Sequence, residues 1–280
     1  MGKIIYGSEL SLELKESLKN EIINYCQNKR RPCLAVILVG DDPASVSYVK
    51  GKDKALKTVG MESVMINLAS DTSQIELIKT IEELNENDSV DGILVQLPLP
   101  RHLNEGQVLD VIDPNKDVDG LHRENVAKLY LNEDGFVPCT PLGIMELLKK
   151  MEIDLEGKHA VVVGRSQLVG QPIAKLLLNA NASVTICHSR TKDLKKICKD
   201  ADVLVVAAGK AKLIDESYVN ENCYVIDVGV NRIGNKLYGD TDFENIKDKC
   251  KAITPVPKGV GPMTITMLLY NTFKAYKKEN

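Results

Sequence analysis

Short, nearly continuous apolar runs alternate with longer amphipathic stretches from one end of the chain to the other. Strands of this kind are buried on both faces, which is typical of a parallel sheet that helices cover on both sides. The pattern therefore predicts the α/β class. The expected strands are 34–39, 64–67, 92–96, 160–163, 183–187, 203–206 and 224–227. The expected helices are 8–28, 43–59, 72–86, 104–112, 142–151, 169–180, 193–199 and 264–278.

The stretch 113–141 has the weakest regular pattern and contains turn signals at Asp113-Pro114 and Asp134-Gly135. A chain of 280 residues is too long for one average domain of roughly 100–200 residues and suits two. We therefore expect the domain junction within this stretch. Thr140-Pro141 then reads as the N-cap and first residue of the next helix.

Composition excludes several classes of partner and location. The 36 basic and 39 acidic residues give a net charge of −3, which argues against nucleic acid or an anionic membrane as the main partner. The apolar runs are far shorter than the roughly 18 residues of a membrane span. No apolar segment follows the first residues, so we expect no secretory signal. The seven scattered cysteines lack metal-ligand spacing and read as small core residues of a cytoplasmic protein.

A glycine-containing turn in the second half predicts nucleotide binding. The usual fingerprint is G-x-G-x-x-G. Here Gly164 and Gly170 are the outer glycines, Ser166 replaces the middle one, and one extra residue precedes the last. Gly164 permits the tight turn, the small Ser166 lets the backbone approach a pyrophosphate, and the following helix offers N–H donors. The turn could instead be purely structural. It opens a βαβαβ series of the expected length, however, which favours a Rossmann-type dinucleotide-binding domain.

The residues after the next strand favour NADP over NAD. An acidic residue usually meets a free ribose 2′-hydroxyl at this position, but the chain has His188-Ser189-Arg190-Thr191 there. Together with Arg165, Ser189 and Arg190 supply cationic and hydroxyl donors that suit a 2′-phosphate. The alternative is that both arginines are ordinary surface charges, which would leave the cofactor preference open.

Lys52 lies on the apolar side of the helix expected over 43–59. At about 100° per residue, it shares a stripe with 45, 48/49, 55/56 and 59, while the other lysines of the helix point elsewhere. Tyr48 lies one turn before Lys52. Burial would lower the pKa of this lysine from about 10.4 and suit it to proton transfer. The alternative is a lysine whose stem packs while its amine reaches water.

Two further polar residues stand where ligands commonly bind. Gln96 ends the strand expected over 92–96, and the carboxyl ends of parallel strands form the usual ligand edge. Asp119 belongs to the acidic, turn-rich segment 117–120 near the expected junction. Each also has an ordinary interpretation, because a glutamine at a strand end is often solvated and Asp-Gly is common in turns.

Six ordered blocks of sequence resemble the bifunctional methylenetetrahydrofolate dehydrogenase/methenyltetrahydrofolate cyclohydrolases, the FolD family. The resemblance covers essentially the whole chain. The blocks are VGDDPASVSYVKGKDKA (39–55), DGILVQLPLP (91–100), KDVDGL (116–121), PCTPLG (138–143), VVVGRSQLVGQP (161–172) and TPVPKGVGPMTITMLL (254–269).

The resemblance implies a role for each residue of the first half singled out above. Lys52 would be the central catalytic residue of the cyclohydrolase step, with Gln96 as its hydrogen-bonding partner. Tyr48 would stack on the folate ring system and help to orient Lys52. Asp119 would bind the aminopyrimidine edge of the pterin, whose donors a carboxylate complements.

The resemblance also implies cofactor contacts and a domain arrangement. Arg165, Ser166 and Ser189 match cofactor phosphate contacts, and Gly261 and Pro262 match a loop that borders the folate site. We expect two α/β domains flanking a cleft, the second a Rossmann-type domain. The folate-binding catalytic domain would comprise 1–140 and the C-terminal helix 263–280. The NADP-binding domain would comprise 141–262.

The implied activity is NADP-dependent oxidation of 5,10-methylenetetrahydrofolate, followed by hydrolysis of the methenyl product to 10-formyltetrahydrofolate. Hydride transfer chiefly needs geometry, whereas hydrolysis needs proton movement. The resemblance also implies a homodimer, and the chemistry requires no metal. Two other functions remain open at this point: a single-activity NADP-dependent dehydrogenase, and a non-catalytic module that senses nucleotides.

The chain departs from the family pattern at a few positions. Lys258 stands where a glycine is common, and Gln167-Leu168 and Gln171 replace more usual Asn or Lys, Ile and basic residues. Lys258 could alter folate affinity, and the loss of a basic residue at 171 leaves the strength of cofactor binding open.

Overall fold

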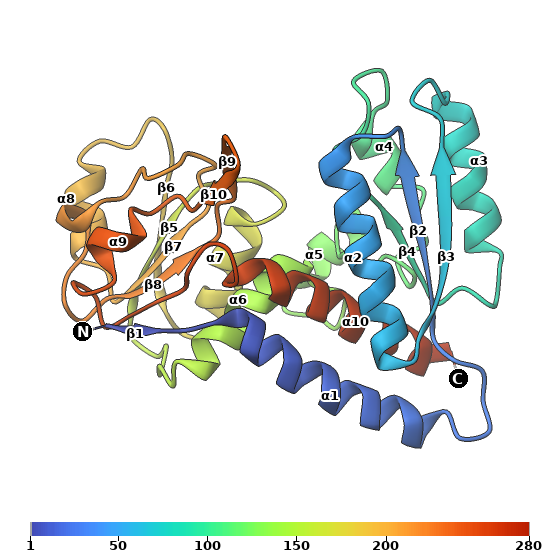
Figure 1. Ribbon diagram of the computed structural model, residues 1–280, viewed down its shortest axis with the longest axis horizontal. Coiled ribbons are helices and arrows are strands. Elements are labelled where there is room, and N and C mark those ends of the chain that lie inside the picture. Colours follow the sequence, from blue (N-terminus) through green and yellow to red (C-terminus); the bar gives the residue numbers. More distant parts are fainter. Residues whose placement is uncertain (1, 280) are drawn as a thin grey trace. The chain divides into compact units, whose positions relative to one another are not determined.

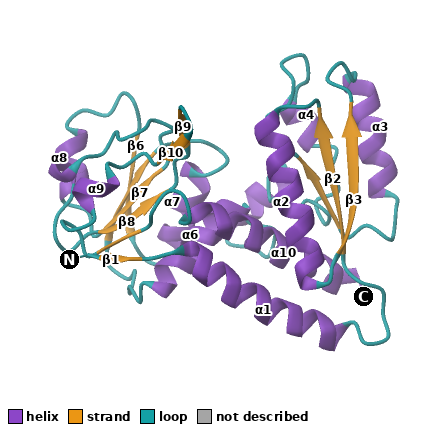
Figure 2. Ribbon diagram, in the orientation of Figure 1, coloured by secondary structure: helices purple, strands orange, loops and turns teal. Residues whose placement is uncertain are grey.

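The computed structural model of the protein describes residues 2–279 (Figures 1 and 2). The chain divides into two compact units. Unit 1 consists of Met1–Leu12 and Thr140–Thr264, and unit 2 consists of Glu13–Cys139 and Ile265–Asn280. Two helices belong partly to each unit, namely α1 (Gly7–Tyr25) and α10 (Val260–Glu279).

Unit 2 holds a three-stranded parallel sheet. Strand β2 (Cys33–Val39) lies between β3 (Glu62–Leu68) and β4 (Gly92–Val95), and every residue of β2 and β4 is buried. In register, Ile37 pairs with Ile66 on one side and with Val95 on the other. Burial on both faces is what the continuous apolar runs predict.

The helices of unit 2 begin and end at residues suited to those positions. Helix α2 (Pro43–Val59) starts where the Asp42 carboxylate accepts a hydrogen bond from Ser45 N, and it ends at Gly60 in the left-handed conformation. Helix α2 packs against β2 and β3. The others are α3 (Gln74–Asn85), α4 (Glu105–Leu109) and α5 (Arg123–Leu131).

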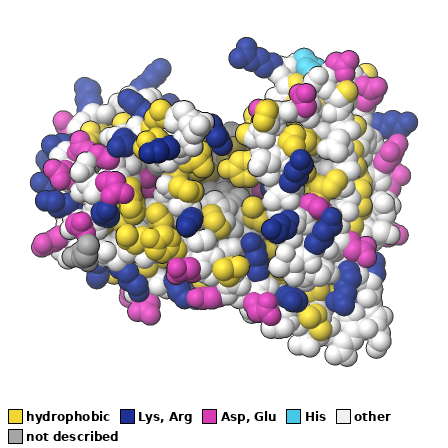
Figure 3. All heavy atoms as spheres, in the orientation of Figure 1, with side chains coloured by type: hydrophobic (Ala, Val, Ile, Leu, Met, Phe, Trp, Pro, Cys, Tyr) yellow, Lys and Arg dark blue, Asp and Glu magenta, His cyan; other side chains and the backbone are white. Residues whose placement is uncertain are grey.

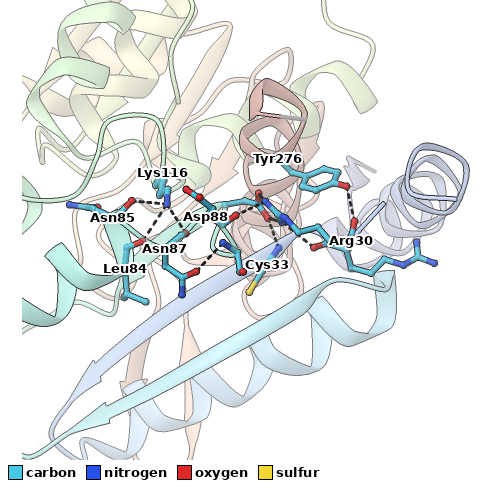
Figure 4. A network of polar contacts seen from close by, with 11 residues as sticks. Arg30, Cys33, Leu84, Asn85, Asn87, Asp88, Lys116 and Tyr276 are labelled. Atoms are coloured by element: carbon cyan, nitrogen blue, oxygen red, sulfur yellow. Dashed lines mark hydrogen bonds and ion pairs between the residues drawn. The ribbon is translucent and has the colours of Figure 1, made fainter. Parts of the chain in front are cut away.

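A partly buried ion pair at the amino end of β2 also involves the C-terminal helix (Figure 4). The Arg30 guanidinium donates to both carboxylate oxygens of Asp91 at 2.7 and 2.6 Å, and Asp91 Oδ2 also accepts from Cys33 N at 2.7 Å. The buried Tyr276 of α10 donates its hydroxyl to Arg30 O at 2.7 Å. These contacts explain why the end of α10 belongs to unit 2.

Unit 1 holds a six-stranded sheet in the order β1-β11-β8-β7-β5-β6, and every pairing is parallel. Strand β5 neighbours both β6 and β7, so the strand order reverses at β5, where ligands bind in doubly wound folds. The strands are β1 (Lys3–Ile4), β5 (His159–Val163), β6 (Ser183–Cys187), β7 (Val203–Val206), β8 (Tyr224–Asp227) and β11 (Ala252–Ile253).

The helices of unit 1 include α7, which packs against β5 and β6. A two-stranded antiparallel ribbon is formed by β9 (Asn231–Ile233) and β10 (Lys236–Tyr238). The remaining elements are α6 (Cys139–Lys150), α7 (Gly170–Asn179), α8 (Leu194–Lys199), η1 (Glu216–Tyr218) and α9 (Phe243–Ile246).

Four details differ from the expectations. The weakly patterned stretch 113–141 contains α5, a polar helix that His122 caps. Helix α6 begins at Cys139, so Thr140 and Pro141 lie inside its first turn and Thr140 is not the N-cap. Helix α10 begins at Val260 rather than near 264. Strand β1, expected in the domain 1–140, pairs with β11 in the sheet of unit 1. Lys3 N donates to Lys251 O and Ile5 N donates to Ile253 O, each at 2.9 Å.

Charge and burial agree with the composition. Figure 3 shows acidic and basic side chains intermixed over the visible face, as a nearly balanced charge predicts. All seven cysteines are buried and free, which confirms the interpretation that they are core residues. Over residues 2–279, none of the helices is both long and apolar enough to traverse a bilayer.

Candidate functional site

A buried lysine and a glutamine meet at the carboxyl edge of the sheet in unit 2. Lys52 is only 9% exposed, on the buried side of α2, as the apolar stripe predicts. Its ammonium donates a hydrogen bond of 2.9 Å to Oε1 of Gln96, which directly follows strand β4. The lysine that snorkels into water, the alternative left open above, is therefore excluded.

Burial gives Lys52 an unusual acidity. Loss of hydration lowers the pKa of its ammonium, and the nearby Asp119 carboxylate opposes that shift. An amine of this kind exchanges its proton more readily than a surface lysine, which suits it to acid–base work.

Gln96 is held in place by a second hydrogen bond. Its Nε2 donates to Leu97 O at 2.6 Å while Oε1 accepts from Lys52. Because both ends of the amide have a partner, the carbonyl oxygen stays directed at the lysine. Tyr48, one turn before Lys52, is 49% exposed and so keeps a ring face available for contact.

Asp119 belongs to a turn that buried polar groups hold from both ends. The buried Lys116 donates to Leu84 O, Asn85 O and Asn87 O at 3.3, 2.8 and 2.9 Å, at the C-terminal end of α3 (Figure 4). The buried Asp117 connects the turn to the residues that follow it. Its carboxylate accepts hydrogen bonds from Leu121 N, His122 N and Asn125 Nδ2.

Cys139 is the side chain near Lys52 that the sequence analysis left outside the site. It is 1% exposed, and burial together with the Asp119 carboxylate raises the pKa of its thiol well above the usual value. The thiol is therefore neutral and packs as a small group beside Lys52 and Asp119. Its position in the PCTPLG block was the one signal that could have indicated it.

A cavity of about 510 Å³ opens in unit 1 beside the carboxyl ends of β5, β6 and β7. This is the edge at which the strand order reverses, where a doubly wound sheet binds ligands. The cavity is lined by Val163, Gly164, Arg165, Ser166, His188, Ser189, Thr191, Leu194, Ala207, Ala208, Lys210 and Leu213.

The two glycines of the turn are required by backbone contacts. Gly164 has φ +134°, and a Cβ there would lie 2.1 Å from Ala207 O. A Cβ at Gly170 would lie 2.3 Å from Gly164 O. The turn is thus tight enough to bring its backbone close to a bound pyrophosphate, and α7 begins directly after it.

Ser166 organises the start of α7, because its Oγ accepts from Val169 N at 3.2 Å and from Gly170 N at 3.3 Å. Arg165 and Ser189 line the cavity, whereas Arg190 is exposed and is not among the lining residues. Gly261 and Pro262, expected in a loop, lie in the first turn of α10 and belong to unit 1, whereas Lys52 belongs to unit 2.

Within the part of the chain that the structure describes, no group of three or more His, Cys, Asp or Glu side chains could hold a metal ion. The arrangement in unit 1 fits a dinucleotide instead, with a glycine turn, a helix N-terminus and an arginine at one cavity.

Comparison with known sequences gives two family matches. The model of the tetrahydrofolate dehydrogenase/cyclohydrolase catalytic domain matches residues 5–119, and that of the NAD(P)-binding domain matches residues 138–280. The chain belongs to this family. It is therefore a bifunctional tetrahydrofolate dehydrogenase/cyclohydrolase, and its second half is an NAD(P)-binding domain, which confirms the resemblance and the α/β, Rossmann-type expectation.

Relatives of the tetrahydrofolate dehydrogenase/cyclohydrolase family match over nearly the full length. The bifunctional protein FolD of Campylobacter hominis is 55% identical over 98% of this chain and 97% of the relative. The crystal structure of the bifunctional FolD enzyme of Campylobacter jejuni is 49% identical, with a TM-score of 0.98 and full coverage of both chains. The Trypanosoma brucei enzyme, solved with NADP and an inhibitor, is 34% identical, with a TM-score of 0.95 over 99% of this chain and 98% of that chain.

Proposed function

We propose that Lys52 performs the proton transfers of the cyclohydrolase step, with Gln96 orienting it. The observation that carries this assignment is the hydrogen bond of 2.9 Å from the ammonium of the buried Lys52 to Gln96 Oε1. Burial lowers the pKa of Lys52, which makes the neutral amine that accepts a proton more accessible than in a surface lysine.

In this step, water adds to the methenyl carbon of 5,10-methenyltetrahydrofolate. Lys52 accepts the first proton that the water loses, which leaves a hydroxyl on that carbon. The bond from the carbon to N5 then breaks as N5 gains a proton and the hydroxyl loses its own proton to become the formyl C=O. The formyl group stays on N10, so the product is 10-formyltetrahydrofolate and one proton is released overall. Tyr48 stacks on the folate rings with its exposed face, and Asp119 accepts hydrogen bonds from the aminopyrimidine edge.

The preceding step is oxidation of 5,10-methylenetetrahydrofolate, and the cofactor proposed for it is NADP. When bound, the nicotinamide supplies the hydride acceptor. The residues of the chain bind and orient the cofactor. Gly164, Gly170 and Ser166 shape the turn for the pyrophosphate. Arg165 and Ser189, together with Arg190, which follows Ser189 in the chain, would contact the 2′-phosphate. The NADP complex of the Trypanosoma brucei relative supports this choice.

The proposal also covers the border of the folate site, the oligomeric state, the cellular location and the division into domains. Gly261 and Pro262, at the start of α10, border the folate site. The chain acts as a homodimer, as the resemblance to the family implies, and works in the cytoplasm, which its seven free cysteines support. The division of function is part of the same proposal: a folate-binding domain, 1–140 with 263–280, and an NADP-binding domain, 141–262, with the short strand β1 pairing in the sheet of the second.

The experiment is to measure both activities of Lys52→Met. Hydride transfer needs no proton acceptor, so the variant should reduce NADP with methylenetetrahydrofolate at a substantial rate while hydrolysis of methenyltetrahydrofolate falls at least a hundredfold. Lys54→Met, an exposed lysine of the same helix, is the control and should retain both activities. Equal loss of both activities in folded Lys52→Met would contradict a proton-transfer role. Failure of the unaltered protein to reduce NADP or NAD would contradict the dehydrogenase assignment.

A further inference from the structure

The carboxylate of Asp240 fills an arc of three consecutive backbone N–H groups. Its Oδ2 accepts from Ala208 N at 2.6 Å and from Gly209 N at 2.8 Å, while Oδ1 accepts from Lys210 N at 2.8 Å. Asn231 Nδ2 donates a fourth hydrogen bond of 2.8 Å to Oδ1. Asp240 is fully buried. Arcs of successive N–H groups commonly bind anions, and here the protein occupies the arc with its own carboxylate.

The segment that Asp240 holds is a wall of the cavity in unit 1. Ala207, Ala208 and Lys210 all line that cavity. Ala207 O is also the atom that a Cβ at Gly164 would meet at 2.1 Å, so this segment packs directly on the glycine turn. A shift of 207–210 would therefore change both the cavity wall and the turn.

A second carboxylate supports Asp240 from behind. Asp227, at the end of β8, accepts from Asp240 N at 2.8 Å, and its other oxygen accepts from Thr241 N and Thr241 Oγ1. A Cβ at Gly239 would lie 1.8 Å from Asp227 Oδ2, and one at Gly229 would lie 2.0 Å from Asp240 Oδ1. Both carboxylates are thus enclosed so closely that their positions are determined by packing.

We propose that Asp240 is a positioning residue of the dehydrogenase, which holds 208–210 in the shape that cofactor binding requires without itself touching the cofactor. This inference rests on the proposed assignment of the cavity to NADP. Since Asp240 occupies the three N–H groups, they are not free to bind a cofactor phosphate, and that task stays with the turn at 164–166.

The decisive variant is Asp240→Asn, which keeps the size of the side chain but replaces one acceptor oxygen by an NH₂ group that faces backbone N–H donors. We expect the dissociation constant for NADP, measured by calorimetry, to rise at least tenfold. The KM for NADP should rise with it, while kcat at saturating NADP stays within about threefold. Hydrolysis of methenyltetrahydrofolate, assayed without any cofactor, should be unchanged, which shows that the variant is folded. Asp248→Asn, an exposed aspartate of the same unit, is the control and should leave NADP binding unchanged.

Unchanged NADP binding by Asp240→Asn would overturn the inference, and so would a parallel loss of hydrolysis and NADP binding in a folded variant. If Asp240→Asn does not fold, Asn231→Ala is the second test, because it removes the fourth donor to Asp240, together with a long hydrogen bond of 3.4 Å to Tyr238 O, and leaves the three backbone N–H groups in place. That variant should bind NADP two- to fivefold more weakly with hydrolysis unchanged, and unaltered binding would overturn the proposal. If the unaltered protein itself binds no NADP, the proposed function fails instead.

Discussion

The Lys52 ammonium on helix α2 and the Gln96 side-chain oxygen at the end of β4 are joined by a hydrogen bond of 2.9 Å, between residues 44 positions apart in the chain. A neutral acceptor satisfies the buried amine without adding a negative charge that would hold its proton more firmly. The pair therefore keeps the lysine both buried and ready to release a proton.

Replacing this neutral acceptor with a charged one should impair hydrolysis. In Gln96→Glu, a carboxylate beside Lys52 would raise the pKa of the ammonium and leave less neutral amine at pH 7. We expect cyclohydrolase activity at pH 7 to fall at least tenfold, and the limb of its pH–rate profile that reports Lys52 to move to higher pH. Gln107→Glu makes the same change at an exposed position of α4 and should have no effect. An unshifted profile in Gln96→Glu would show that Lys52 is not the titrating group.

Removal of the cavity arginine should distinguish the two nicotinamide cofactors. Arg165 lines the cavity, and the extra 2′-phosphate of NADP is the group that needs a cation. Arg165→Ala should raise the KM for NADP several times more than the KM for NAD, and adding Arg190→Ala should increase the difference. Lys199→Ala, which removes an exposed positive charge outside the cavity, should change neither. Equal effects on both cofactors would argue against recognition of a 2′-phosphate by these residues.

Lys258 offers a test of backbone strain at a departure from the family pattern. Its φ of +81° lies in the left-handed region, which costs a residue with a Cβ about 1–2 kcal/mol but costs glycine little. Lys258→Gly should raise the free energy of unfolding by about 0.5–1 kcal/mol, once the greater flexibility of glycine in the unfolded chain is subtracted. Lys258→Ala keeps the Cβ and should show no gain in urea unfolding. A gain of the same size in both variants would mean that the lysine side chain, rather than the backbone, is responsible.

Asp227 should make the stability of the protein depend on pH. Burial raises the pKa of its carboxyl to about 6, above the usual 3.8, so the folded state binds this proton more tightly than the unfolded state. The associated stability is present below about pH 4 and is lost as the pH rises through about 6. The test compares the free energies of unfolding of the unaltered protein and of Asp227→Asn. The unaltered value minus the variant value should fall by up to about 3 kcal/mol between pH 4 and 7.

Urea unfolding at four pH values across this range would measure the difference, with the exposed Asp248→Asn as the control that should show no such trend. A difference that grows with pH would mean that the hydrogen bonds to Asp227 favour its ionised form more than burial disfavours it.

Local pattern was sufficient to predict the long elements of both sheets and the orientation of Lys52. Strands such as β7 and β8 end where the apolar runs end, because burial on both faces leaves a continuous signal in the chain. The side of α2 that carries Lys52 followed from helical periodicity, since residues three or four apart share a face.

Very short elements, and contacts between segments that are remote in the chain, could not be predicted from local pattern. Strands β1 and β11 contain two residues each and form through pairing in the sheet of unit 1, where β1 pairs with β11 and β11 pairs with β8. Helix α5 is polar and depends on contacts such as that of Asn125 with Asp117. Cys139 looked like any other core cysteine until folding placed it near Asp119.

By itself, the sequence determined the fold class, the family, and which side chains face inward, because these properties depend on the order and spacing of residue types along one element. Only the tertiary structure decided which side chains meet, as when the Asp240 carboxylate fills the arc at 208–210 from about 30 residues away in the chain. The physical reason is that a hydrogen bond requires donor and acceptor within about 3 Å, and no local periodicity specifies that distance between remote segments.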